Sequence, residues 1–216
     1  MRNNMRLLTL LILLAPLWSV GQLTITGTIK SLPEGAVLTL HANDLNSEPV
    51  AKSTAVSGKF SMKTAQREPG IYVLNFAAGN KRKVMFLDNS QVSIDGSADA
   101  FDKLVVKGSP SDADFQVFST EISPLYQKLS AAAQLINSGK QDAATRAAYD
   151  QSMKAIQQKT DQFVQTRPGS YVSPFVILVA TQLNTEPMIT EARFQKLTPT
   201  VQQSGFGKML QSNIAE

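Results

Sequence analysis

Side chains able to carry out nucleophilic, acid–base or metal chemistry are few in this sequence. His41 is the single histidine, and there is no cysteine. A serine nucleophile of the triad type needs a histidine base, and no Gly-x-Ser-x-Gly motif accompanies His41. We therefore expect no catalytic triad, no thiol nucleophile and no thiolate metal site. His41 itself is interpreted as an ordinary residue at the surface or rim of a strand.

Carboxylates are the next candidates for chemistry. Asp112 and Asp114 come nearest to a calcium-loop pattern, but they lack the glycine and the distal glutamate of that motif. They precede a predicted helix, where negative charge is favourable, so Asp112 or Ser111 is predicted to cap that helix. Glycoside cleavage needs two carboxylates paired in space. A hydrolase using such a pair is the third and weakest hypothesis for function.

One dense basic cluster, Lys81-Arg82-Lys83, is the candidate contact for a ligand or partner. Three cations in a row attract phosphate, lipid A or an acidic partner. The alternative interpretation is a solvated hairpin tip, or protection of an edge strand by charge. Neither a phosphate-binding glycine loop nor a dinucleotide fingerprint is present, so we expect no cofactor and no bound metal.

The first 21 residues have the pattern of a cleavable signal peptide. Arg2 and Arg6 precede an apolar run over residues 7–20, and residues 19–21 are small enough for cleavage after Gly21. A transmembrane helix needs about 20 apolar residues, so this run is too short. We predict a periplasmic mature chain without a transmembrane segment. Losing two arginines lowers the formal charge from +4 to +2, and without a concentrated basic stripe nucleic-acid binding is not expected.

The mature chain divides into two halves of opposite type, which predicts an α+β fold. Residues 22–108 carry short segments of alternating apolar and polar residues, as half-buried strands do. Turn pairs such as Ser57-Gly58 and Gly79-Asn80 separate them. Seven or eight strands are expected, in an antiparallel β-sandwich or an open barrel. Their expected positions are Leu23–Thr26, Ala36–Ala42, Val50–Val56, Lys59–Lys63, Ile71–Phe76, Arg82–Leu87, Val92–Ile94 and Leu104–Val106.

Residues 109–216 carry helical periodicity. A stripe of apolar residues at spacings of three and four runs from Phe115 to Ile136, with Pro124 inside it as a predicted kink. A weaker stripe runs from Tyr149 to Phe163. Together they predict an antiparallel helical hairpin. Shorter helices are expected near residues 172–183, 191–197 and 206–216.

Several short motifs follow one another in a fixed order along the chain: Leu23–Ile29, Leu32–Gly35, Ser57–Phe60, Glu68–Tyr72, Val105–Ser109, Leu197–Pro199 and Ser204–Lys208. They resemble an uncharacterised N-terminal domain of Gram-negative envelope proteins, and the whole is similar to the front region of TlpA/ResA-type thiol-disulfide oxidoreductases. The resemblance implies a β domain and a helical segment placed before a thioredoxin-like domain.

The catalytic part of that family, with its Cys-x-x-Cys pair, has no counterpart in this sequence. The chain is therefore expected to be either the front of a longer reductase or a free-standing relative. Our leading hypothesis is a non-catalytic envelope module that binds or positions a partner, an unknown envelope protein or ligand. The alternative is a free-standing domain that binds an envelope glycan or lipid near Lys81, Arg82 and Lys83.

Overall fold

The N-terminal half consists of short strands, as the alternation of its residues predicts. The computed structural model describes residues 23–43, 45–65, 68–88, 91–183 and 186–215, so the predicted signal peptide lies outside it. The strands are β1 (Leu23–Lys30), β2 (Val37–Ala42), β3 (Ala51–Thr54), β4 (Lys59–Thr64), β5 (Gly70–Phe76), β6 (Lys81–Leu87), β7 (Gln91–Ser97) and β8 (Val105–Lys107). All eight overlap predicted segments, with bounds that differ by up to four residues, as in β1.

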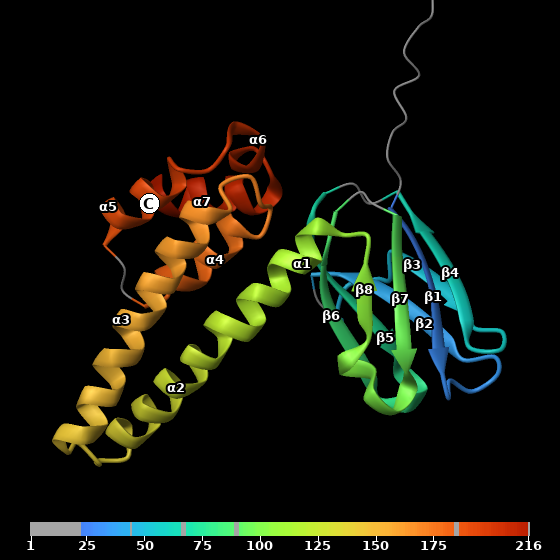
Figure 1. Cartoon of the computed structure of the whole chain (residues 1–216), viewed down its shortest axis with the longest axis horizontal. Coiled ribbons are helices and arrows are strands. Elements are labelled where there is room, and N and C mark those ends of the chain that lie inside the picture. Colours follow the sequence, from blue (N-terminus) through green and yellow to red (C-terminus); the bar gives the residue numbers. More distant parts are fainter. Residues whose placement is uncertain (1–22, 44, 66–67, 89–90, 184–185, 216) are drawn as a thin grey trace, which may run out of the picture.

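These strands form two four-stranded sheets, which confirms the α+β class and the sandwich (Figure 1). Sheet A has the order β4-β1-β7-β8, and sheet B has the order β3-β2-β5-β6. One pairing differs from the antiparallel arrangement that we expected, because β1 runs parallel to β7. Alternation along a strand reports which side chains face inward, but it does not report the direction of the neighbouring strand.

One apolar core lies between the two sheets. It is built from the inward-facing residue of each alternating pair, so burying it holds the sheets together. Its fully buried members include Ile25, Ile29, Leu38, Leu40, Leu74, Met85, Leu87 and Ile94. Two 3-10 helices, η1 (Ala77–Gly79) and η2 (Ala98–Lys103), lie in this half, and Phe101 of η2 joins the core.

A glycine at the centre of sheet A makes room for an aromatic ring. Gly27 of β1 stands opposite Phe60 of β4. A Cβ at Gly27 would lie 2.5 Å from the Phe60 ring and closer still to the carbonyl oxygen of Ile94. Only a residue without a side chain fits there.

The helical half begins with a long rod that leaves the sandwich (Figure 1). Its parts are α1 (Pro110–Val117), the π turn η3 (Phe118–Ile122) and α2 (Ser123–Asn137). Ser109 caps it, since the Ser109 hydroxyl accepts from the Asp112 N–H at 3.2 Å. The predicted cap at Ser111 or Asp112 was therefore wrong. Pro110 explains the difference, because a residue before proline avoids the helical conformation and so becomes the cap.

The irregularity predicted at Pro124 takes the form of the π turn. Proline has no N–H, so it cannot complete the helical hydrogen bond to the carbonyl four residues earlier. The widened turn lies directly before it, and the Thr120 hydroxyl donates to the Gln116 carbonyl oxygen at 2.8 Å. The helix thus continues past the proline.

The rod folds back on α3 (Ala143–Thr166) to make the predicted hairpin (Figure 1). Asp142 is the N-cap of α3, and its carboxylate accepts a hydrogen bond from the Thr145 N–H at 2.8 Å. Buried side chains on the facing sides of α2 and α3 close the pair, and they are Leu129, Ala132, Ile156 and Phe163.

Four helices follow among the described residues: α4 (Ser173–Thr181), α5 (Pro187–Phe194), α6 (Pro199–Gln202) and α7 (Gly205–Ala215). The short α6 was not anticipated from the sequence. Arg193 of α5 is buried and donates from Nε to the Asp161 carboxylate of α3 at 2.8 Å, which ties α5 to the hairpin. Within the described ranges, no helix has the length and apolar character to cross a membrane.

Candidate functional site

The predicted basic cluster lies on β6, an edge strand of sheet B. Lys81 pairs with Phe76 and Lys83 with Leu74, so both lysines share the inward side of the strand, while Arg82 takes the opposite side. Lys81 Nζ donates to the Ala98 carbonyl oxygen at 2.5 Å, and Lys83 Nζ to that of Asp102 at 2.8 Å. The two lysines hold η2 against the sheet, and the three cations do not converge.

A cavity of about 620 Å³ lies beside Lys81 at one end of the sandwich. It is largely apolar, and its wall includes Pro33, Val37, Phe76 and Ala78. The cavity gives an apolar ligand a place to lie with Lys81 at its margin. The assignment of a ligand to Lys81, Arg82 and Lys83 stays a prediction.

The second region of interest is the junction between the two halves. The start of α1 completes the edge of sheet B: the Asp112 carboxylate accepts from the Phe86 N–H at 3.1 Å, and the Ser109 hydroxyl donates to the Phe86 carbonyl oxygen at 3.1 Å. Because β6 has no neighbouring strand on its outer side in the described part of the chain, the N–H and the carbonyl group of Phe86 would otherwise have no backbone partner there, and the start of α1 supplies both partners. Gln116 adds a hydrogen bond to the same carboxylate at 3.4 Å.

Asp112 is 2 % exposed, so its charge is held in an environment poor in water. Burial raises the pKa of the Asp112 carboxyl above its usual value, and the hydrogen bonds from Phe86 and Gln116 and the charge of Lys83 partly oppose the rise. The carboxylate therefore works as a structural acceptor between β6 and α1. Sequence patterning could not reveal this role, because Phe86 is 26 residues away from Asp112 along the chain.

An aromatic cluster fills the junction. Phe86 of β6 is fully buried, with ring centroids 6.1 Å from Phe115, 6.5 Å from Phe175 and 5.8 Å from Phe206. Phe118 joins it, 5.2 Å from Phe175. Such edge and tilted pairs are attractive at these distances. The cluster packs α1, α4 and α7 onto sheet B.

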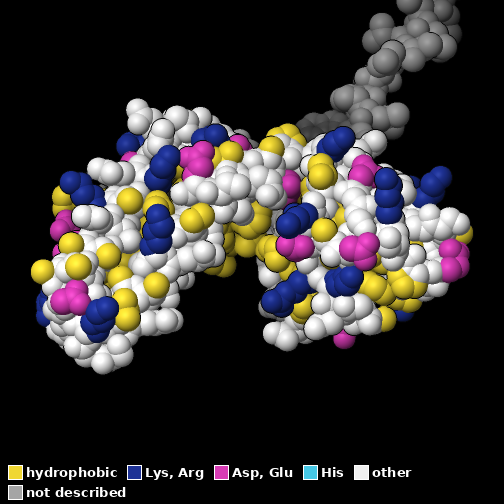
Figure 2. Space-filling model, turned by 60° about the horizontal axis from the view of Figure 1, so that its bottom comes forward, with side chains coloured by type: hydrophobic (Ala, Val, Ile, Leu, Met, Phe, Trp, Pro, Cys, Tyr) yellow, Lys and Arg dark blue, Asp and Glu magenta, His cyan; other side chains and the backbone are white. Residues whose placement is uncertain are grey.

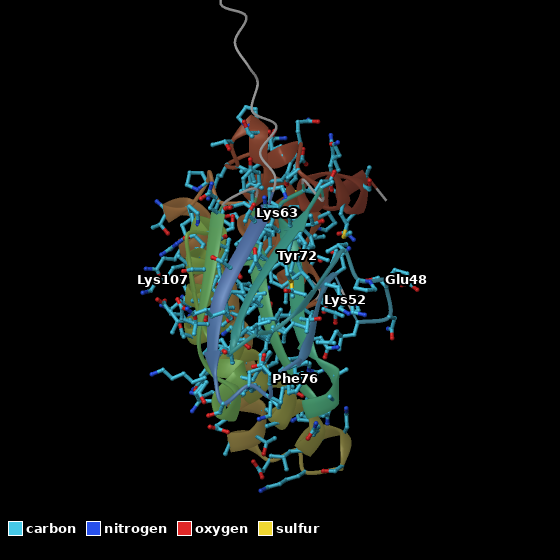
Figure 3. The ribbon with its side chains drawn as sticks, turned by 90° about the vertical axis from the view of Figure 1, so that its right-hand side faces the viewer. Glu48, Lys52, Lys63, Tyr72, Phe76 and Lys107 are labelled. Atoms are coloured by element: carbon cyan, nitrogen blue, oxygen red, sulfur yellow. The ribbon has the colours of Figure 1, made fainter. Side chains whose placement is uncertain are left out.

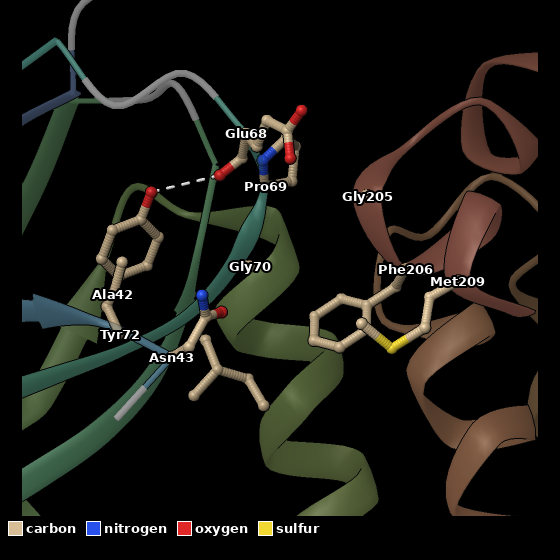
Figure 4. A pocket seen from close by; sticks show the side chains of 10 residues that line it. Ala42, Asn43, Glu68, Pro69, Gly70, Tyr72, Gly205, Phe206 and Met209 are labelled. Carbon is tan, nitrogen blue, oxygen red and sulfur yellow. Dashed lines mark hydrogen bonds between the residues drawn. The ribbon is translucent and has the colours of Figure 1, made fainter. Parts of the chain in front are cut away.

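Beside this cluster a small pocket of about 160 Å³ opens between the sandwich and α7 (Figure 4). Tyr72 donates from its hydroxyl to the Glu68 carbonyl oxygen at 3.1 Å, as the dashed line marks. Burial first, and the Glu68 charge second, raise the pKa of Tyr72 to about 12. Tyr72 is therefore a neutral donor at physiological pH and not a base. Across the pocket lie Phe206 and Met209 of α7 (Figure 4).

The same two residues line an apolar groove of about 500 Å³ between α4 and α7. Phe175, Leu178 and Val179 form its α4 side, and Met209 is 58 % exposed. Uncharged polar residues complete the lining: Thr181, Gln182, Ser212 and Asn213. Figure 2 shows hydrophobic side chains gathered where the two halves meet. The groove and the pocket share Phe206 and Met209 in their linings, and sequence patterning did not single out this surface.

His41 is more buried than we predicted. It is 8 % exposed on β2, with its ring nitrogens 2.9 Å from the Ser47 carbonyl oxygen and 3.0 Å from the Thr39 hydroxyl. The contact with Ser47 holds a loop against the sheet, and the contact with Thr39 stays within β2. Asp114 also has a structural partner, since Arg167 donates to its carboxylate at 3.0 Å. In the part of the chain that the structure describes, no three His, Cys, Asp or Glu residues cluster as a metal site.

Comparison with protein families matches residues 23–115 to a family described as a domain of unknown function, DUF4369. The matched segment covers the sandwich and the first residues of α1, so it includes Ser109 and Asp112 with the β6 edge that they complete. Neither the curated proteins nor the solved structures contain a match to this chain.

Proposed function

We propose that this chain is a non-catalytic module of the cell envelope, exported by its N-terminal segment, that binds or positions a partner protein. The apolar groove between α4 and α7 carries this proposal. Met209 is exposed and Phe206 half-buried, and both offer apolar surface within an uncharged polar margin. Exposed apolar patches with polar rims are typical of protein interaction sites.

The resemblance to the front region of TlpA/ResA-type oxidoreductases supports the choice of partner. In that family a thioredoxin-like domain follows the segment that resembles Ser204–Lys208, and in this chain that segment opens α7. A thioredoxin-fold protein of the envelope is therefore the expected occupant of the groove. The match of residues 23–115 to DUF4369 is compatible with this proposal.

A photo-crosslinking residue at position 209 tests the proposal in the envelope of the producing cell. We expect a crosslinked species from position 209 whose second component, identified by mass spectrometry, has a thioredoxin fold. The matched control places the same residue at Val56, which is 63 % exposed on the distant β3–β4 turn. Equal crosslinking at both positions, or none at position 209, would contradict a partner on the groove.

The non-catalytic part of the proposal has its own test. Purified mature chain is added to an insulin-reduction assay with dithiothreitol, and its rate is compared with the background rate. We expect no difference, because the sequence contains no cysteine to cycle between thiol and disulfide. Turnover above background would overturn the assignment.

A second candidate function is binding of an envelope lipid or glycan in the cavity beside Lys81, and the size and apolar wall of that cavity favour it. Thermal unfolding is compared with and without lipid A for the wild type and for Ala78→Trp, which fills the cavity. A stabilising shift in the wild type that is lost in the variant would support this function. The absence of any shift would count against it.

A further inference from the structure

Sheet A presents an outward face of one chemical kind over all four of its strands. Its inward positions join the core, and its outward positions carry small polar side chains among lysines. The outward positions are Thr24, Thr26, Thr28 and Lys30 on β1, Lys59, Ser61 and Lys63 on β4, Gln91, Ser93, Asp95 and Ser97 on β7, and Val105 and Lys107 on β8. Most of these residues are exposed and the rest half-buried.

The charge on this face is strongly one-sided. Four lysines stand against a single acid at these positions, Asp95. Among the described residues, none of the four lysines takes part in an ion pair. The lysines of β6 behave differently, since Lys81 and Lys83 are bound to backbone carbonyl oxygens. The ammonium groups of sheet A are therefore available to a ligand.

The register of the strands places the lysine side chains and the threonine and serine hydroxyls in rows across sheet A. Lys63 stands beside Thr24, Ser61 beside Thr26, and Lys107 beside Ser93 on the other margin. At about 4.8 Å between neighbouring strands, the two edge strands lie roughly 14 Å apart. Cations thus flank a strip of hydroxyl groups that follows β1. Figure 3 shows the sandwich from its edge and labels Lys63 and Lys107 of this sheet.

We propose that the outward face of sheet A binds an anionic polysaccharide, whose acidic groups meet the lysines and whose hydroxyls meet the threonines and serines. The acidic groups are sugar carboxylates or sugar phosphates. This goes beyond the proposed function, since sheet A faces away from the helices that pack on sheet B. Binding rests on charge complementarity and is therefore sensitive to salt.

The composition of the face favours a polysaccharide over a lipid surface. Among its outward positions, the one large apolar residue is Val105, 52 % exposed, and none is aromatic. Membrane association is strengthened by apolar side chains that enter the interface, which this face does not offer. Its hydroxyl strip matches a ligand that is itself rich in hydroxyl groups, with many donors and acceptors side by side.

Polygalacturonate, a polymer of sugar carboxylates, is the first probe, and a phosphorylated dextran is the second. Binding to the intact mature chain is measured by calorimetry at low and at physiological salt. We expect Lys30→Gln, Lys59→Gln, Lys63→Gln and Lys107→Gln, combined, to weaken binding by about tenfold or more and to flatten its salt dependence. Circular dichroism checks that the variant is folded.

The matched control removes the same charge from the helical half, with Lys128→Gln, Lys140→Gln, Lys154→Gln and Lys196→Gln combined. All four residues are exposed, and this variant should bind as the wild type does. If both variants lose the same affinity for the anionic polymers, net charge alone explains the binding and the proposal fails. If neutral dextran binds as tightly as the anionic polymers, charge has no role and the proposal also fails. Binding confined to vesicles of phosphatidylglycerol, or no binding to either anionic polymer, would overturn the proposal.

A second variant separates the hydroxyl strip from the lysines. Thr24→Val, Thr26→Val and Thr28→Val, combined, keep the shape and the charge of the face and remove its central hydroxyls. We expect severalfold weaker binding of both anionic polymers. If the lysine variant instead self-associates while its monomer binds normally, the lysines serve to protect the edge strands, and the proposal fails.

Discussion

The two sheets of the sandwich share one core, yet their outward faces have opposite surroundings. Sheet B carries Ile71 and Phe86 on its outward side, where the helical half packs over them. Sheet A carries threonine, serine and lysine there, and these residues lie in solvent. The inward pattern builds the sandwich, and the outward residue types decide which sheet receives the helices. Four predictions test this comparison, beginning with the largest expected effect.

Phe86→Ala removes the ring on which α1, α4 and α7 converge. The buried aromatic contacts are lost and a cavity is left, so we expect the free energy of unfolding to fall by about 3–5 kcal/mol. Thr26→Ala, at an exposed position on the central strand of sheet A, should change it by about 0.5 kcal/mol or less. Chemical denaturation of the two variants provides the measurement. Similar losses in both would remove the contrast between the faces.

Gly27→Ala and Gly70→Ala compare the two sheets at a glycine. A methyl group at Gly27 meets Phe60 and the Ile94 carbonyl, whereas at Gly70 the nearest of the atoms around it is 3.9 Å away. We expect Gly27→Ala to lower the free energy of unfolding by about 1–3 kcal/mol and Gly70→Ala to leave it nearly unchanged. Thermal unfolding of the wild type and both variants measures these differences in stability. A harmless Gly27→Ala would show that β1 and β4 can move apart.

Asp112→Ala leaves the Phe86 N–H without its acceptor at the edge of sheet B. A buried donor that loses its partner costs about 1–3 kcal/mol, so stability should fall by that amount. Asp112→Asn keeps an oxygen in the same place and should be close to the wild type at acidic pH. Denaturation of the two variants at one pH gives the comparison. Equal losses in both would show that the hydrogen bond is not the cause.

The pH dependence of Asp112 gives the smallest effect. Because its pKa is raised in the folded state, the folded chain binds more protons than the unfolded chain above the ordinary aspartate pKa of about 3.9. Its contribution to stability is then complete below that pH and declines as pH rises through the raised pKa. Asp112→Asn lacks this decline. The stability of the variant relative to the wild type should therefore increase with pH, and a flat difference would contradict the assignment.

Local features of this fold could be predicted from the sequence to a large extent. Alternation located all eight strands. The Ser57-Gly58 turn was recognisable because this pair of residues separates two strand segments, and in the structure both residues take the positive φ that such a turn uses, at 50° and 72°. The apolar stripes located the hairpin. These signals succeed because each depends on the spacing of residues along a single element.

Features that join distant elements could not be predicted in this way. The bond between Asp112 and Phe86, the parallel pairing of β1 with β7, and the groove at Phe206 and Met209 each arise from tertiary packing. Lys81 and Lys83 looked like a site because adjacency in sequence suggests a patch. On a strand, adjacent side chains point to opposite sides, and the flanking lysines were turned inward to η2.

The parallel pairing of β1 with β7 imposes an order on the appearance of the fold. Thr24 pairs with Gln91, so β1 lacks its second neighbour in sheet A until most of the β half has been synthesised. Contacts between such distant residues form slowly, because the entropy of closing a long loop is lost before the contacts contribute any stabilising free energy. During that interval β1 has one apolar side and one edge without a partner. Such an edge can pair with a second chain, so the late formation of β7 is a natural point for a chaperone to act.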